Sequence, residues 1–228
     1  MIELVRVAKT FNEGKSNVFS ALKGIDLNIE SRLITVFRGP SGSGKTTLLS
    51  IIGGMARPTS GRIWLNGREM TSLPERFAAI TRRETFGFIF QNYNLIKGIT
   101  VLENVMLPAY PTGMRHHHMR ERAMTLLDRF RLGSKAFEKM EHLSGGEQQR
   151  TAIARALIND PPVIIADEPT AHLDTELSVA FMNIVSELKH GAKTVLMASH
   201  DPLVCDFPSV DRLVSLRDGM IISEEGAS

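Results

Sequence analysis

The segment GPSGSGKT, residues 39–46, decides the fold because of what stands on either side of it. The apolar run LITVF (33–37) precedes it and the apolar-periodic segment LLSIIGGM (48–55) follows, which predicts a buried strand, a glycine-rich loop and a helix. In this context the segment matches G-x-x-x-x-G-K-[ST], whose glycines let successive backbone N–H groups converge on phosphate oxygens at a helix N-terminus. We expect Lys45 to place its charge near the outer phosphates and the Thr46 hydroxyl to bind Mg²⁺. A glycine-rich turn without a ligand is the weaker alternative, since every fixed position matches.

A second apolar segment, VIIADE (163–168), ends in two carboxylates. We expect Asp167 to lie at the carboxyl end of a strand beside the strand that feeds the glycine-rich loop, where it would hold Mg²⁺ through the water shell of the metal. Glu168 would then orient or deprotonate an attacking water. An apolar run that ends in Asp-Glu is common by itself, so this interpretation depends on its combination with the loop.

Hydrophobic periodicity predicts the remaining elements and a helical block in the middle of the chain. Lys23-Gly24 and the polar segment NEGKSN are expected to be turns between N-terminal strands. Strands are expected at 2–7, 18–22, 25–29, 85–91 and 194–199 and near 61–67, helices at 73–83, within 100–140 and at 177–190, and a hairpin around Asp218-Gly219.

The segment LSGGEQQR (143–150) narrows the choice of protein family. Taken alone, Ser144 followed by two glycines is equally consistent with a helix N-cap and with an anion site at a helix N-terminus. As a string it matches the signature sequence of ABC-type ATPases, and the chain resembles an ABC transporter ATP-binding subunit along essentially its whole length.

The resemblance implies an α/β fold: a P-loop NTPase (RecA-like) core, an N-terminal antiparallel β subdomain and an α-helical insertion subdomain. We expect a single domain over 1–228, with the core and β subdomain at about 1–91 and 143–228 and the helical subdomain at about 92–142. The implied activity is hydrolysis of ATP with Mg²⁺ in a head-to-tail dimer of two copies. The implied partner is an integral membrane permease on a separate chain, with this chain at the cytoplasmic face of the membrane.

The resemblance also assigns site residues. Gln91 looks like the glutamine that senses Mg²⁺ and faces the membrane partner, and His200 looks like the histidine that contacts the γ-phosphate. Phe11 stands where the family usually stacks a tyrosine on adenine. The implied catalytic residues are Glu168, His200, Lys45 and Gln91, and the implied metal ligands are Thr46, Gln91 and Asp167. The implied nucleotide-binding residues are Phe11, Gly39, Pro40, Ser41, Gly42, Ser43, Gly44, Lys45, Thr46, Thr47, Gln91 and His200, with Ser144, Gly145, Gly146, Gln148 and Asp174 completing the site across the dimer.

Within the class, stretches such as GFIFQNYNLI and TVLENVMLP resemble the branch of lipoprotein-releasing, macrolide-export and cell-division ATPases. Export or release of a lipoprotein, peptide or hydrophobic compound is therefore expected. The alternative is a mechanical regulator, whose ATPase cycle drives a permease-like protein that activates an enzyme across the membrane. A DNA-repair ATPase is disfavoured, because no heptad block long enough for a coiled coil lies between Lys45 and Ser144.

Three positions depart from the branch. Arg38 replaces an apolar residue, Ser31-Arg32 replaces Gly-Glu, and Ala171-His172 replaces small residues near the expected dimer interface. None of them removes a catalytic group.

Composition excludes several classes of protein. A net charge of +2 over 228 residues argues against a protein whose main partner is nucleic acid. Cys205 is the only cysteine, which excludes an intrachain disulfide and favours a reducing compartment. We find no signal peptide and no stretch of ~20 apolar residues. The run HHHM (116–119) is expected to be a solvated helix face, because adjacent helical residues lie ~100° apart and three consecutive histidines cannot converge on one ion.

Overall fold

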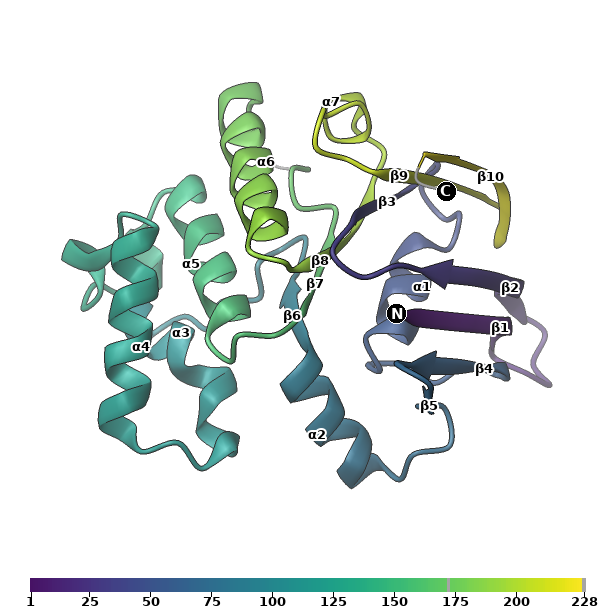
Figure 1. Ribbon diagram of the computed structural model, residues 1–228, viewed down its shortest axis with the longest axis horizontal. Coiled ribbons are helices and arrows are strands. Elements are labelled where there is room, and N and C mark those ends of the chain that lie inside the picture. Colours follow the sequence, from purple (N-terminus) through teal and green to yellow (C-terminus); the bar gives the residue numbers. More distant parts are fainter. Residues whose placement is uncertain (172, 227–228) are drawn as a thin grey trace.

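The computed structural model describes residues 1–171 and 173–226 and contains a six-stranded sheet of order β10-β9-β3-β8-β7-β6 (Figure 1). All neighbours are parallel except the β9–β10 hairpin. β8 lies between β3 and β7, so the expectation that Asp167 stands on the strand beside the P-loop strand is wrong by one strand. The strands are β3 (Ile34–Arg38), β6 (Phe86–Ile89), β7 (Val163–Asp167), β8 (Thr194–Ser199), β9 (Arg212–Arg217) and β10 (Met220–Gly226).

A four-stranded antiparallel sheet of order β2-β1-β4-β5 forms the N-terminal part. The expected turn at Lys23-Gly24 is absent, because one strand runs through it. Gly24 has a φ of 80° and no partner in the register between Lys23 and Ile25, so it is accommodated as a β-bulge. The strands are β1 (Ile2–Phe11), β2 (Phe19–Ile29), β4 (Ser60–Leu65) and β5 (Arg68–Glu69).

Helices cover both faces of the six-stranded sheet. α1 packs in a core of buried residues shared by the two sheets, whereas α3, α4, α5 and α6 share a second core on the other face. In Figure 1, α3, α4 and α5 gather at one end of the molecule, away from the four-stranded sheet. The helices are α1 (Lys45–Ile52), α2 (Glu75–Thr85), α3 (Val101–Met106), η1 (Leu107–Thr112), α4 (His116–Arg129), η2 (Gly133–Lys135), η3 (Met140–His142), α5 (Gly145–Leu157), α6 (Thr175–His190) and α7 (Pro202–Cys205).

The expected helical block is present, and its proline residues explain how it is divided. Pro108 and Pro111 lie in the 3₁₀ segment η1 between α3 and α4, where a regular α-helix would lose backbone hydrogen bonds. The division of the chain at about 92 and 142 stays a prediction. Among the described residues, no helix is both long and apolar enough to cross a membrane.

The Asp218-Gly219 hairpin forms as expected and also braces the glycine-rich loop. Both residues have positive φ, 51° and 79°, as a two-residue turn of this hand requires. The Gly219 N–H donates to the Ser43 carbonyl (3.1 Å), and the Gly219 carbonyl accepts from the Lys23 N–H (2.9 Å). One turn therefore joins the C-terminal hairpin, the P-loop and β2.

Candidate active site

Close backbone approaches hold the P-loop. Gly44, the N-cap of α1, has a φ of 104°, and a Cβ there would lie 2.6 Å from the Ala21 carbonyl oxygen. A Cβ on Gly39 would lie 2.2 Å from the Leu216 carbonyl oxygen. Glycine is therefore required at both positions, and the loop is wedged between β2 and β9.

The loop presents polar groups suited to an anion. Lys45 is only 5% exposed, and its Nζ donates to the carbonyls of Gly39 (2.7 Å) and Pro40 (3.1 Å). The Ser43 hydroxyl is buried without a hydrogen-bond partner in the part of the chain that the structure describes. Gly44 offers no side chain to cap α1, so the first N–H groups of the helix are left for a ligand. These features fit a phosphate chain.

Thr46 and Asp167 supply a pair of oxygens beside the loop. The Thr46 hydroxyl donates to Asp167 Oδ1 at 3.0 Å. Burial raises the pKa of Asp167; the Thr46 hydrogen bond opposes this shift and the nearby charge of Glu168 adds to it. A cation at this position would relieve both the burial penalty and the like charge. Hydroxyl and carboxylate oxygens are the donors that Mg²⁺ prefers, so the residues fit this metal.

Glu168 lies between Lys45 and His200. Its Oε1 is 3.5 Å from Lys45 Nζ, its Oε2 is 3.0 Å from His200 Nδ1, and its side chain is 14% exposed. The backbone of Glu168 has a φ of 44°, which costs about 1–2 kcal/mol for a residue with a Cβ. Its N–H donates to the Ala198 carbonyl on β8 (2.9 Å), which holds the strained turn at the end of β7 in place. Strain of this kind is typical of functional positions.

The structure brings most of the expected site residues around one pocket of about 330 Å³. Ser41, Gly42, Ser43, Gly44, Lys45, Thr46, Thr47, Gln91, Glu168 and His200 line it. Gly39 and Pro40 border a neighbouring pocket that His200 also lines. Segments from four strand ends therefore converge on the N-terminus of α1.

Two lining residues were not foreseen from the sequence, Phe19 and Ala21 of β2. Phe11 does not line the pocket. It stands directly opposite Phe19 across the β1–β2 pair, and Lys9 lies over its ring at 5.1 Å. Phe11 and Phe19 are both exposed, at 42% and 54%. The signal that could have identified Phe19 is this cross-strand pairing of two aromatic residues at the loop end of a hairpin.

The signature residues lie outside this pocket, at the N-terminus of α5. Ser144 caps the helix: its Oγ accepts from the Glu147 N–H (3.4 Å), and the Glu147 carboxylate accepts from the Ser144 N–H (2.8 Å). A hydrogen bond from Lys135 (2.7 Å) and those from Ser144 lower the pKa of Glu147 to about 2. The Gln148 side chain donates to the Leu143 carbonyl at 2.9 Å. Gly145 and Gly146 form the first turn of the helix.

Asp174 also lies away from the pocket, as the N-cap of α6, where its Oδ1 accepts from the Leu177 N–H (2.8 Å). The departure at His172 lies outside the described residues. Arg38 has a structural role: its guanidinium donates to Ser215 Oγ (2.8 Å) on β9 and pairs with Glu225 (2.6 Å) on β10. Cys205 is half-buried against the core, as expected, and burial raises the pKa of its thiol.

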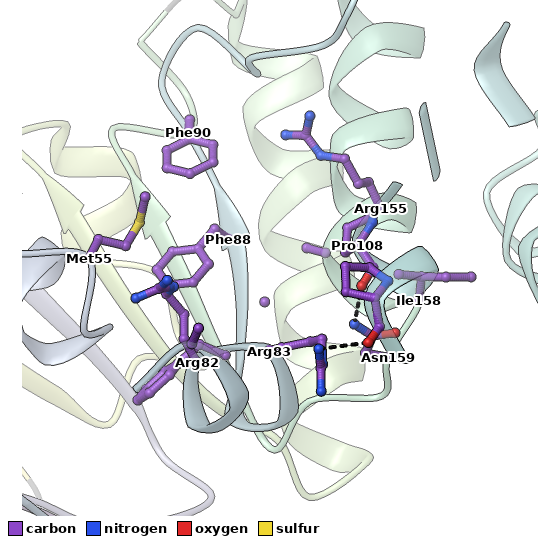
Figure 2. A pocket seen from close by; sticks show the side chains of 14 residues that line it. Met55, Arg82, Arg83, Phe88, Phe90, Pro108, Arg155, Ile158 and Asn159 are labelled. Carbon is purple, nitrogen blue, oxygen red and sulfur yellow. Dashed lines mark hydrogen bonds between the residues drawn. The ribbon is translucent and has the colours of Figure 1, made fainter. Parts of the chain in front are cut away.

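A separate groove of about 380 Å³ opens between β6, α2, η1 and the end of α5 (Figure 2). Its walls are mainly apolar, with Met55, Phe88, Phe90, Pro108 and Ile158 among the lining residues, but three arginines also line it: Arg82, Arg83 and Arg155.

Two polar atoms in the groove are buried and unpaired among the described residues: Arg83 Nε and Asn159 Oδ1. The other ends of the same side chains donate to the carbonyls of Pro111 (2.8 Å) and Pro108 (2.9 Å), as Figure 2 shows for the Asn159–Pro108 pair. Within the described part of the chain, one donor and one acceptor therefore lie buried and unpaired beneath the apolar wall of the groove.

The family model for ABC transporters matches residues 22–171 of this chain. The chain belongs to the ABC transporter family. It is 41% identical over 222 residues to an uncharacterized ABC transporter ATP-binding protein of Methanocaldococcus jannaschii, MJ1508, an alignment that covers 97% of this chain and 98% of the relative. It is 43% identical over 227 residues to the macrolide export ATP-binding/permease protein MacB of Hyphomonas neptunium. That match covers 99% of this chain but 35% of MacB, so the chain spans about a third of the length of that curated relative.

Solved ABC cassettes have the same fold. The ATP-binding cassette MJ0796, in a dimeric post-hydrolysis structure with ADP and Pi, superposes with a TM-score of 0.90 at 39% identity, covering 99% of this chain and 98% of that chain. The expected ABC ATPase fold, with its antiparallel β subdomain and its helical region, is therefore confirmed, and the chain is an ABC-type ATPase.

Proposed function

We propose that this ABC ATPase hydrolyses ATP in a head-to-tail dimer and that its cycle drives a membrane permease. The observation that carries the proposal is the placement of Glu168. A carboxylate held in a strained backbone conformation faces the P-loop pocket, with Lys45 on one side and His200 on the other.

The P-loop residues would bind the phosphates of ATP. The N–H groups at the start of α1 and the buried Lys45 ammonium would stabilise negative charge on the phosphates. Lys45 would then exchange its bonds to the Gly39 and Pro40 carbonyls for phosphate oxygens. Thr46 and Asp167 would hold Mg²⁺, and Gln91 would lie at the edge of the same pocket. The metal would neutralise negative charge on the phosphates.

Glu168 would orient and deprotonate the attacking water, because its carboxylate is the acceptor that faces the pocket from the strand end. His200, 67% exposed in its side chain, would contact the γ-phosphate and would keep Glu168 oriented through Nδ1. Lys45 Nζ lies 3.5 Å from Glu168 Oε1, so the same ammonium group adjoins both the phosphate site and the base.

A second copy of the chain would complete the site. Ser144, Gly145, Gly146 and Gln148 lie outside the P-loop pocket of their own chain, and Asp174 caps a different helix. The cassette MJ0796 is described as dimeric with ADP and Pi bound, which supports a dimeric form of this chain. We propose that the signature residues of each copy close over the nucleotide held by the other.

The groove of Figure 2 is the proposed docking site for the permease. It is apolar, concave and positioned directly after β6, so it adjoins Gln91 and can pass a movement at the nucleotide to a bound segment. Arg82 and Arg83 line the groove, and their guanidinium groups would attract a carboxylate on that segment. An apolar permease segment that carries an acidic residue is the occupant with this chemistry.

The curated relatives support export. MacB of Hyphomonas neptunium is named a macrolide export ATP-binding/permease protein, and MJ1508 is named an ATP-binding protein. We propose that this chain works at the cytoplasmic face of the membrane with a permease on a separate chain. The cargo would be a lipoprotein, peptide or hydrophobic compound. A mechanical regulator of an enzyme outside the cytoplasm is the second candidate, since the same ATPase site would serve it.

The test of the ATPase proposal is the Glu168→Gln variant, which removes the carboxylate that acts as the base but keeps the shape of the side chain. We expect turnover to fall by about 10²–10⁴-fold, because that is the usual contribution of a positioned general base. ATP binding should persist, and the dimer should accumulate on size-exclusion chromatography with ATP and Mg²⁺. Glu30→Gln, which alters an exposed carboxylate that lines neither of the two pockets at the P-loop, is the control. Undiminished turnover in Glu168→Gln would refute the assigned role.

A further inference from the structure

Three potential metal ligands gather in the first turns of α4, away from the P-loop pocket. His117 Nδ1 lies 3.0 Å from Glu121 Oε2, and His118 Nδ1 lies 3.5 Å from the same oxygen. One ligand atom from each of the three residues lies within 4.8 Å of the others. All three side chains are exposed, between 62% and 74%.

Glu121 explains how two consecutive histidines can share one ion. Adjacent residues on a helix diverge by ~100°, but Glu121 follows His117 by four residues and His118 by three, so its Cβ lies between theirs in projection. Helical side chains lean toward the N-terminus, which brings the Glu121 carboxylate back toward both imidazole rings. His116 is not part of the cluster among the described residues.

Two of the three distances between the ligand atoms are close to those around a small tetrahedral ion, and the third is within 4.8 Å. With metal–ligand bonds of about 2.0–2.2 Å, two ligand atoms of a tetrahedral site lie about 3.3–3.6 Å apart. The observed 3.0 and 3.5 Å lie close to this range. The two imidazole rings are 5.5 Å apart between centroids and meet edge to face, so they are not stacked on one another.

The ligand types select the kind of metal. Two imidazoles and one carboxylate are a poor set for Ca²⁺ or Mg²⁺, which depend on several oxygen ligands, and suit Zn²⁺, Ni²⁺ or Cu²⁺, which form strong bonds to imidazole. Arg115, Arg120 and Arg122 flank the cluster and the positive end of the helix dipole lies beside it, which opposes any dication, so the bonds to imidazole must supply the affinity.

We propose that His117, His118 and Glu121 form a surface site for a divalent transition metal, with Zn²⁺ as the probe ion and water in the remaining position. A metal bound there links residues within a five-residue segment and fixes the first turns of α4. α4 packs against α5 in the same core, and α5 begins with the signature residues. A metal that stabilises α4 would therefore also support the position of α5. A ligand that binds only the folded chain raises the melting temperature as its concentration rises above Kd.

The experiment is titration of ZnCl₂ into the full chain, prepared without a polyhistidine tag and in the presence of Mg²⁺, followed by calorimetry and equilibrium dialysis. We expect one Zn²⁺ per chain and a higher melting temperature at saturating Zn²⁺. His118→Ala and Glu121→Gln should each weaken binding by at least tenfold. Glu121→His should retain binding, because an imidazole four residues after His117 lies on the same helix face and can share the ion with it.

The matched control is His116→Ala, which removes a neighbouring exposed imidazole that lies outside the cluster. This variant should bind Zn²⁺ as the wild type does. All the altered side chains are exposed, so their variants should keep the wild-type melting temperature without metal. Absence of stoichiometric Zn²⁺ binding, or an equal loss of binding in His116→Ala and His118→Ala, would overturn the proposal.

Discussion

The close approach between β6 and α5 can be tested with Gly87→Ala. Gly87 lies in β6, and a Cβ there would stand 2.3 Å from the Ala156 carbonyl oxygen and 2.9 Å from Pro161 Cγ. The φ of Gly87 is not in the left-handed region, so alanine can adopt the backbone conformation and the effect is purely steric. Since a carbon rests about 3.3–3.6 Å from a carbonyl oxygen at best, α5 must retreat from β6 by about 1 Å.

Overpacking of a close-packed core costs about 1–3 kcal/mol. For a chain of 150–250 residues each kcal/mol lowers the melting temperature by about 2–4 °C, so the variant should melt roughly 2–12 °C below the wild type. Thermal unfolding followed by circular dichroism measures this. Gly145→Ala is the matched control, because a Cβ at the start of α5 meets no atom within 4 Å. A Gly87→Ala protein that melts within about 1 °C of that control would show that β6 and α5 are not in tight contact.

Two further predictions concern α5, the helix that begins with the signature residues, and the two aromatic residues Phe11 and Phe19. Because the pKa of Glu147 is lowered to about 2 from 4.5, its stabilising contribution is complete above pH about 4.5 and is lost as the pH falls from there toward 2. Lys135→Gln should therefore destabilise the chain at pH 7 more than at pH 3 in urea unfolding; an equal effect at both pH values would contradict this. Phe19→Ala should weaken ATP binding more than Phe11→Ala, because only Phe19 of these two lines the pocket, and equal losses measured by nucleotide titration would show that both rings contact the base.

Local sequence patterns predicted the P-loop, the buried strands and the helical block, because each depends on neighbours in the chain. The order of the sheet could not be obtained in this way. β8 enters between β3 and β7 although it comes later in the sequence, and nothing in VIIADE distinguishes a strand beside β3 from the next one out. Asp167 nevertheless accepts a hydrogen bond from the Thr46 hydroxyl in the first turn of α1. The bulge at Gly24 was mistaken for a turn, since glycine is used for both.

The site residues also fall into two groups: those that a local motif positions and those that only the pairing of distant strands brings together. Lys45 and Thr46 have positions fixed by a local motif, whereas Glu168 and His200 come together only through parallel pairing of β7 with β8. Phe19 was missed because its role depends on the register of β2 against β1, which includes three irregularities. The groove beside β6 could not be predicted either, since its walls come from β6, α2, η1, the end of α5 and the loop after α1, which periodicity treats separately.

The proposed mechanism requires the N-termini of α1 and α5 to contact phosphate, and the two helices differ in how these ends are capped. α1 begins at Gly44 without a side-chain cap, so its N–H groups can bind a phosphate without breaking a bond to a capping side chain. α5 begins at Ser144, whose hydroxyl and N–H are both bonded to Glu147, and Glu147 is tied in turn to Lys135. A phosphate that approaches α5 must therefore compete with these bonds. ATP is accordingly expected to bind the P-loop of one copy first, and the signature helix of the second copy to engage only when the phosphates are already in place.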